Sequence, residues 1–182
     1  MKRLLAMVIF ALPSPVVFAQ APVEAGAWYM GLQSGLGHIN VGNDNADSFG
    51  FSWSLGYRFN SGLLAEAGAS LQTSDDIFGN GDTYDLKREE LLLGYQFRLG
   101  DTMRLIPKFG RVNWDLHSRD GALISASEDA QSQDLGKGTA NIAELVLEFR
   151  INDTLQLGVA YEKLRYRFGE SKTTDFSIRF EF

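Results

Sequence analysis

The sequence predicts an all-β protein, an eight-stranded antiparallel up-and-down transmembrane β-barrel. Residues 175–182 alternate without interruption between a polar and a large apolar residue, and the chain ends on Phe182. A period of two indicates a strand with one apolar and one polar face. Turn signals alternate between short and long ones along the chain, and charged residues recur on the polar faces of the alternating segments. These three features are typical of a barrel that crosses a membrane.

The first residues predict a signal peptide. Two basic residues follow Met1, residues 4–12 form an apolar run, and a short segment ending at Ala19 resembles a cleavage site. This order is that of a secretory signal. The apolar run is far shorter than the roughly 20 residues that a membrane-spanning helix needs. We therefore expect a signal peptide over residues 1–19 and one outer-membrane barrel domain over residues 20–182.

The composition excludes several classes of function. The chain carries 17 Lys and Arg against 23 Asp and Glu, a formal net charge of −6. A duplex nucleic acid would be repelled by this charge, so no nucleic-acid partner is expected. Cysteine is absent, which excludes disulfides and thiolate metal ligands.

The turn signals predict the number of strands and their orientation. The short signals are at residues 60–62, 100–102 and 152–154, and the longer polar segments are at residues 42–47, 74–82, 119–138 and 169–172. Seven connections join eight strands. Outer-membrane barrels have short turns at the periplasmic end and long loops outside. The asymmetry therefore predicts which end of each strand faces the periplasm.

The strands that end at short turns or at the terminus have the clearest alternation. Their apolar positions are Phe51, Trp53, Leu55, Tyr57 and Phe59; Leu91, Leu93, Tyr95, Phe97 and Leu99; Ala143, Leu145, Leu147, Phe149 and Ile151; and Phe176, Ile178, Phe180 and Phe182. The fifth strand is less regular, because Leu105 and Phe109 lie on one face while Ile106, Val112 and Trp114 lie on the other. A bulge that switches the alternation would explain this irregularity.

The polar faces predict a lumen filled by ion pairs. Six cations and six anions share the inward register: Arg58, Arg88, Arg98, Lys108, Arg150 and Arg179 with Glu66, Glu90, Glu144, Glu148, Glu162 and Glu181. An eight-stranded barrel has an interior just wide enough for side chains. Buried ions persist only when they are paired and hydrogen-bonded. We therefore expect a plug of salt bridges, with a proton relay or an acid-base catalytic pair as the alternative.

Several short motifs resemble those of a known family. They are the opening strand at residues 27–31, the glycines Gly35 and Gly37, the Leu-Gly-Tyr at residues 93–95 and the closing Phe182. The mature chain resembles the OmpA-type transmembrane domain and the small outer-membrane barrels of the OmpX and Ail group. The resemblance implies a bacterial outer-membrane location, a role in envelope integrity, and loops that bind any host or surface ligand. The chain ends with the barrel, so the peptidoglycan-binding domain of OmpA-type proteins cannot be carried over.

The resemblance also assigns a role to the last strand. In this family the terminal strand is the signal that the barrel assembly machinery reads during biogenesis. The positions that match it are Phe176, Ile178, Phe180 and Phe182.

Five cations lie beyond the apolar positions on the lipid-facing register. They are Lys87, Arg111, Lys163, Arg165 and Lys172. A charge on the lipid face costs close to nothing near the interface. Arg can hold a phosphate bidentately, so these cations predict an outer rim that binds lipopolysaccharide phosphates. The alternative is that they are solvated or paired with Asp85, Glu89 and Glu170.

Two other functions fit the sequence less well. A lipid A-modifying enzyme would need a paired nucleophile and base, but His117 and Ser118 are strand neighbours that point to opposite faces, and His38 has no evident serine partner. A narrow ion-conducting pore is the other alternative. The acidic loop residues, which include Asp134, do not match a calcium-binding loop. The sequence thus predicts no catalytic residue, cofactor or metal.

Overall fold

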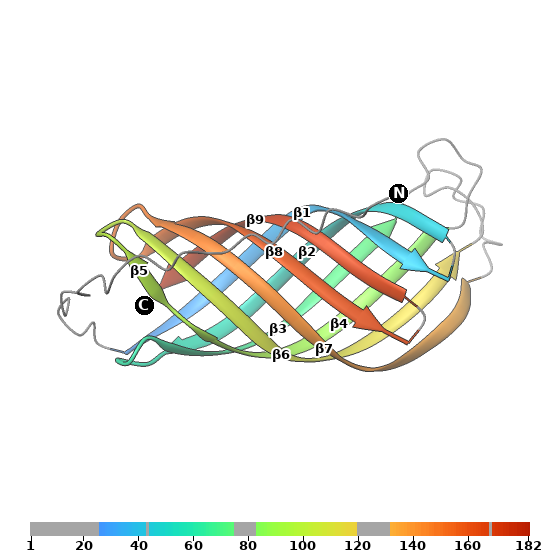
Figure 1. Ribbon diagram of the computed structural model, residues 1–182, viewed down its shortest axis with the longest axis horizontal. Coiled ribbons are helices and arrows are strands. Elements are labelled where there is room, and N and C mark those ends of the chain that lie inside the picture. The colour runs from blue at the N-terminus through green and yellow to red at the C-terminus, as the bar shows by residue number, and fades with distance from the viewer. Residues whose placement is uncertain (1–25, 43, 75–82, 120–131, 168) are drawn as a thin grey trace, which may run out of the picture.

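The computed structural model describes residues 26–42, 44–74, 83–119, 132–167 and 169–182 (Figure 1). The strands are β1 (Ala27–Val41), β2 (Asp44–Arg58), β3 (Leu63–Ser74), β4 (Thr83–Tyr95), β5 (Phe97–Leu99), β6 (Met103–Arg119), β7 (Ser132–Arg150), β8 (Leu155–Tyr166) and β9 (Gly169–Glu181). No helix within these ranges is long and apolar enough to span a bilayer. The predicted signal peptide lies outside the described residues.

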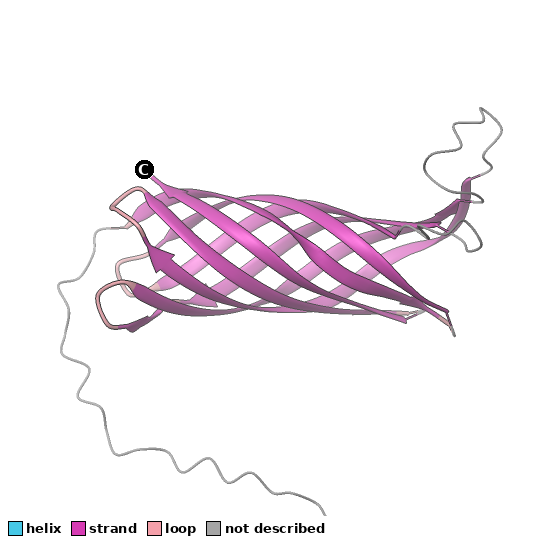
Figure 2. Cartoon of the chain, turned by 90° about the horizontal axis from the view of Figure 1, so that it is seen from above, coloured by secondary structure: helices cyan, strands magenta, loops and turns pink. Residues whose placement is uncertain are grey.

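The strands form one closed antiparallel sheet (Figure 2). Each strand pairs with its neighbours in sequence, and β1 also pairs with β9 from Tyr29 opposite Glu181 to Val41 opposite Gly169. β4 and β5 both pair with β6 and are interrupted only at Gln96, so together they form one of eight barrel strands. Closure leaves no unpaired strand edge in the hydrocarbon. The predicted eight-stranded barrel is confirmed.

The three short turns all lie at one end of the barrel (Figure 1). Gly62 and Gly100 adopt φ angles of 87° in two of them, a conformation that only glycine takes without steric cost. At the other end the strands extend further than predicted. Segments 44–47, 132–138 and 169–172 were predicted as loop and are strand. The strand pairing continues through these segments. Their polar composition is explained by a position above the hydrocarbon, where side chains contact water. The predicted loop segments 75–82 and 120–131 lie outside the described residues.

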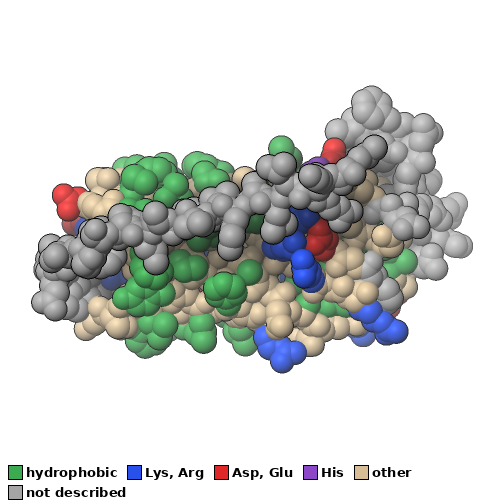
Figure 3. Space-filling model, viewed as in Figure 1, with side chains coloured by type: hydrophobic (Ala, Val, Ile, Leu, Met, Phe, Trp, Pro, Cys, Tyr) green, Lys and Arg blue, Asp and Glu red, His purple; other side chains and the backbone are tan. Residues whose placement is uncertain are grey.

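A band of apolar side chains covers the outer surface nearer the short turns, and cations lie beyond it towards the opposite end (Figure 3). Phe51, Trp53, Leu91 and Leu93 are each at least half exposed, as expected of residues that face lipid. Ring pairs such as Trp28 with Tyr57 lie near the short turns, with centroids 5.2 Å apart. Such aromatic girdles are typical of the membrane interface.

The fifth barrel strand, β6, alternates without a switch from Met103 to Leu116. The predicted switch is therefore wrong. Ile106, Val112 and Trp114 face the lumen and are buried: Val112 and Trp114 belong to an apolar cluster nearer the loop end, and Ile106 belongs to a smaller cluster that includes Leu64 and Val146. A register shift does occur between β6 and β7, but it lies higher, between Leu116 and His117.

Candidate functional site

The part of the lumen nearer the short turns is built around Lys108. Its Nζ lies 3.0 Å from Glu66 Oε2 and 3.0 Å from Glu144 Oε2, and all three side chains are buried. Tyr29 donates a hydrogen bond of 2.9 Å to Glu66, and Gln33 donates one of 2.7 Å to Glu144. One ammonium thus holds two carboxylates from strands on different sides of the barrel, β3 and β7.

Further ion pairs continue this network across the lumen. Arg179 lies 3.1 Å from Glu148, and its guanidinium stacks 4.2 Å from the centre of the Tyr29 ring. Further buried pairs include Arg58 with Glu181 and Arg88 with Glu162. Each carboxylate receives hydrogen bonds from its cation. Buried charges are tolerated only when they are paired and hydrogen-bonded in this way.

Three residues of the predicted lumen set differ from the expected buried ion pairs in their burial or their hydrogen bonding. Glu90 is buried in the lumen, but its Oε2 has no hydrogen-bond partner within the described ranges. Arg98 and Arg150 are only half-buried, because each lies at the end of a strand beside a short turn. Arg150 pairs with Asp153 in its turn.

One cation of the network, Arg104, is not in the set predicted from the sequence. Arg104 is buried, and its Nη1 lies 3.4 Å from Glu181 Oε1. Arg104 shares the inward register of Lys108, and that register is the signal that could have found it. The neutral partners Tyr29 and Gln33 were missed because polar alternation alone does not mark an uncharged lumen residue.

The half of the lumen nearer the loop end holds an apolar cluster beside a group of buried polar side chains, in which Gln72 donates a hydrogen bond to Ser48 and accepts one from Ser171. The buried residues of the apolar cluster include Ile39, Leu86, Trp114, Leu116 and Tyr166. The rings of Trp114 and Tyr166 lie 5.4 Å apart. Deeper in the lumen, the cavity beside the Lys108 network has a volume of about 10 Å³, which is about the space of one water molecule. Side chains thus leave little free space beside the Lys108 network.

Three of the predicted rim cations gather around one carboxylate. Lys163 and Arg165 lie 3.2 Å and 3.8 Å from Glu170, and Lys172 also contacts it. Hydrogen bonds from Lys172 and Lys163 hold the pKa of Glu170 below its usual range, so Glu170 is ionised at neutral pH. Three cations sharing one carboxylate leave this part of the rim positive.

The other two predicted rim cations, Lys87 and Arg111, are exposed on the outer surface of β4 and β6. Lys87 borders a groove of about 730 Å³ on that surface. The groove is lined among others by Phe51, Trp53, Leu71, Lys87, Lys137 and Thr139. Arg111 donates a hydrogen bond of 3.3 Å to Thr139. The groove thus combines apolar side chains of the lipid face with cations at the level of the rim.

The two histidines do not form a serine-histidine pair in the described part of the chain. Ser118 is buried towards the lumen, while the nearest carboxylate to His117 is Asp115, 3.0 Å from its Nε2. His38 pairs with Asp47 at 2.7 Å. Ser118 and His117 lie on opposite faces of β6, as their adjacency predicts.

The last strand presents its apolar side chains to lipid. Phe176 and Phe182 are more than half exposed, and Phe180 and Ile178 are partly exposed. The backbone N–H of Phe182 donates to the carbonyl of Trp28 (2.9 Å), and the N–H of Trp28 donates to the carbonyl of Phe182 (3.2 Å). The final residue thus takes part in closing the barrel.

These features define a transmembrane β-barrel, and solved structures share its fold. The Neisserial surface protein A is similar with a TM-score of 0.67 and 13% identity over 87% of this chain and 100% of that one. Ail of Yersinia pestis, in complex with the heparin analogue sucrose octasulfate, matches at 0.63 and 14% over the same shares. The N-terminal barrel domain of Pseudomonas aeruginosa OprF matches at 0.54 and 15%, over 85% of this chain and 97% of that one.

The family follows from the sequence match. The profile of the outer membrane protein beta-barrel domain matches residues 4–182, so the chain belongs to this family. Among curated proteins, none matches the chain. The chain is a small barrel of the bacterial outer membrane, as predicted.

Proposed function

We propose that the protein is a side-chain-filled barrel that acts at the outer surface of the membrane, by binding the phosphate groups of lipopolysaccharide at its rim. The observation that carries this proposal is the outward placement of Lys87, Arg111, Lys163, Arg165 and Lys172 beyond the apolar band. We further propose that residues 1–19 direct export and that the barrel assembly machinery inserts residues 20–182. Neither catalysis nor solute passage is part of this function.

The chemistry of the rim supports a phosphorylated lipid as ligand. Lipid A has acyl chains below its phosphates, and the groove on the outer surface places Trp53 and Leu71 beside Lys87. Around Glu170, the side chain of Arg165 is 77% exposed and so remains available to an anion. Charge-assisted bonds from Lys and Arg to phosphate are about twice as strong as neutral hydrogen bonds.

The Ail structure contains a polysulfated ligand, sucrose octasulfate. Sulfate and phosphate groups are recognised by the same kinds of cation. A surface glycan at this rim is therefore the second candidate ligand, and it is best tested beside lipopolysaccharide in the same assay.

Two alternatives fit the structure less well. A lipid A-modifying enzyme needs a nucleophile beside a base, whereas His117 and Ser118 lie on opposite faces. An ion-conducting pore needs an open polar path, whereas an apolar cluster that includes Leu86 and Trp114 occupies part of the lumen nearer the loops. Hydrophobic constrictions exclude water and ions.

The triple substitution Arg111→Gln, Lys163→Gln and Arg165→Gln should weaken lipopolysaccharide binding. Three phosphate-binding cations are removed while the strands and the lumen are unchanged. We expect less lipopolysaccharide to co-purify, and a smaller rise in thermal unfolding temperature on its addition. The loss should be larger at low salt, because salt screens exposed charges beyond about 10 Å at 0.1 M.

The control is Arg150→Gln, which removes a cation at the turn end of the barrel. It should leave lipopolysaccharide stabilisation at the wild-type level. Sucrose octasulfate is added in a parallel series, and stabilisation by this compound alone would favour a glycan ligand. Equal stabilisation of the triple variant and wild type by lipopolysaccharide at low salt would contradict the rim proposal. A mass change in lipid A incubated with the protein would favour the enzyme.

A further inference from the structure

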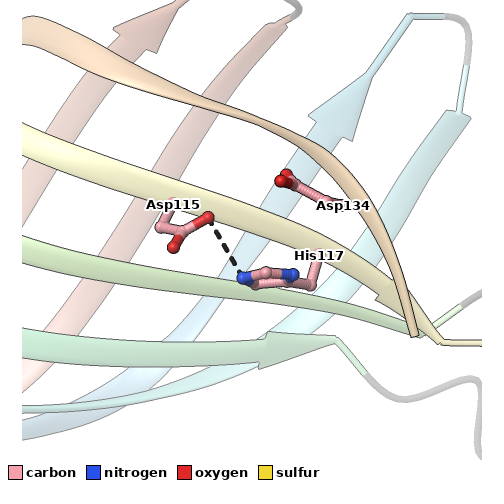
Figure 4. Close-up of side chains that lie close together, drawn as sticks. All are labelled: Asp115, His117 and Asp134. Atoms are coloured by element: carbon pink, nitrogen blue, oxygen red, sulfur yellow. Dashed lines mark ion pairs between the residues drawn. The ribbon is translucent and has the colours of Figure 1, made fainter.

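One group of three metal-ligating side chains lies on the outer surface of β6 and β7 (Figure 4). Asp115 and His117 are two residues apart on β6 and face outward together, as alternation requires. Asp134 lies opposite His117 on β7. One ligand atom from each residue lies within 4.8 Å of the others, and this is the only such group within the described residues.

A β-bulge brings the third residue to the site. Leu116 pairs with Gly136 and His117 pairs with Asp134, so Leu135 is the extra residue of β7. Without the bulge, Leu135 would lie opposite His117. Instead, Leu135 packs against the apolar lumen cluster and Asp134 takes the outward position. Bulges re-aim side chains in this way and are frequent at barrel rims and next to functional sites.

The bulge also orients the carboxylate of Asp134. Gly136 has a φ of 134°, a conformation that favours glycine. The N–H of Gly136 donates a hydrogen bond of 2.8 Å to Asp134 Oδ1. One carboxylate oxygen is thus held by the backbone, and Oδ2 is left for a ligand. Support of this kind orients the ligands of metal sites in proteins.

One carboxylate oxygen of Asp115 faces His117 without a hydrogen bond. Oδ1 of Asp115 is shielded from solvent and accepts no hydrogen bond of good geometry within the described ranges. It nevertheless lies 3.0 Å from Nε2 of His117. Register places Lys87 and Lys137 on either side of Asp115, yet no ion pair joins Asp115 to these lysines.

Two ligand atoms that are close without a hydrogen bond fit adjacent positions around one ion. Zinc ligands lie about 2.0–2.2 Å from the metal, which places neighbouring atoms of a tetrahedral site about 3.3–3.6 Å apart. The contact of 3.0 Å between Asp115 and His117 is slightly shorter than this, so the two side chains need to separate by only a few tenths of an ångström. Asp134 is exposed, so its side chain can move the short distance that remains.

We infer that Asp115, His117 and Asp134 form a binding site for a divalent transition-metal ion of the zinc type. An imidazole with two carboxylates balances the charge of a divalent cation and leaves a fourth position for water. Calcium is disfavoured, because it takes six to eight oxygen ligands. The ion would cross-link β6 to β7 where the two strands leave the membrane, immediately before residues 120–131.

The test uses the full mature chain, without a histidine tag, refolded in detergent in the absence of lipopolysaccharide and stripped with EDTA. Zinc chloride is titrated by calorimetry, and we expect one Zn²⁺ per chain. His117→Gln and Asp134→Asn should each weaken the affinity by at least about tenfold, since loss of even supporting partners costs 10–100-fold. Both variants should keep the heat-dependent gel shift of a folded barrel. In wild type, Cu²⁺ should show coupling to one nitrogen by electron paramagnetic resonance, and His117→Gln should abolish it.

His38→Gln is the matched control, because His38 is the other of the two histidines and pairs with a single carboxylate, Asp47. It should bind Zn²⁺ as wild type does. The absence of stoichiometric Zn²⁺ binding by wild type would overturn the inference. So would unchanged affinity in both His117→Gln and Asp134→Asn, or displacement of Zn²⁺ by an equal concentration of Ca²⁺. If His117→Gln does not fold, the result for Asp134→Asn decides.

Discussion

Lys108→Met should destabilise the folded barrel by about 3–5 kcal/mol, the usual cost of breaking a buried ion pair from one side. The substitution leaves Glu66 and Glu144 buried without the ammonium that lies 3.0 Å from each. Two like charges would then share a site from which water is excluded. Urea unfolding in detergent, followed by the gel shift between folded and unfolded barrel, measures the change.

Two further variants separate the charge effect from loss of packing. Lys87→Met makes the same change at an exposed position on the outer surface and should alter stability by less than about 1 kcal/mol. Adding Glu66→Gln and Glu144→Gln to Lys108→Met should recover much of the loss, because neutral amides replace the unpaired carboxylates. If the free energy of unfolding of Lys108→Met is within about 1 kcal/mol of the wild-type value, this network does not stabilise the barrel.

Phe182→Ser should sharply lower the amount of folded barrel in the outer membrane, while changing stability in detergent by only about 1 kcal/mol. The ring of Phe182 is 73% exposed, so it contributes little to packing within the barrel. The substitution also keeps the two backbone hydrogen bonds to Trp28. The expected loss therefore comes from recognition during assembly. Quantitative surface labelling of cells at matched expression measures it.

Phe97→Ser is the control for this prediction. Phe97 is also a partly exposed phenylalanine of the lipid face, on β5 near the short turns, but it lies outside the last strand. It should reach the surface at a level close to that of wild type. Equal surface levels for Phe182→Ser and wild type would contradict a role of the terminal residue in assembly.

The strands of the barrel wall could be predicted from the sequence, because the alternation of polar and apolar residues lies within each strand. A period of two places Trp53 and Leu93 on the lipid face whichever strands pair with theirs. The extent of the strands could not be predicted in this way. Residues 132–138 are polar and rich in small residues, and they are strand because β6 supplies their hydrogen bonds, which local composition does not reveal.

The sites depend on register, which sequence alone leaves open. Val112 and Trp114 look irregular in the sequence because they are apolar at inward positions, and only the structure shows that they belong to an apolar cluster in the lumen. The bulge at Leu135 changes which residue faces outward opposite His117. A one-residue shift moves every following side chain to the other face. The group of Asp115, His117 and Asp134 therefore could not be assembled from spacing.

The occupied lumen and the exposed cations of the rim both favour a function at the outer surface. The Lys108 network and the apolar cluster around Trp114 both occupy the lumen, and we propose for this reason that ligands bind on the outer surface. Rim cations such as Arg165 are exposed there. The strands that carry them extend above the apolar band and are fixed by pairing along their described length.

Conductance in planar lipid bilayers tests the filled lumen most directly. The wild-type barrel, with insertion verified by the heat-dependent gel shift of the recovered protein, should give no sustained current steps in molar salt. Trp114→Gly combined with Tyr166→Gly widens only the lumen nearer the loops, so this variant should also stay closed because the Lys108 network still fills the other half. A steady ohmic conductance of the wild-type barrel would contradict the account.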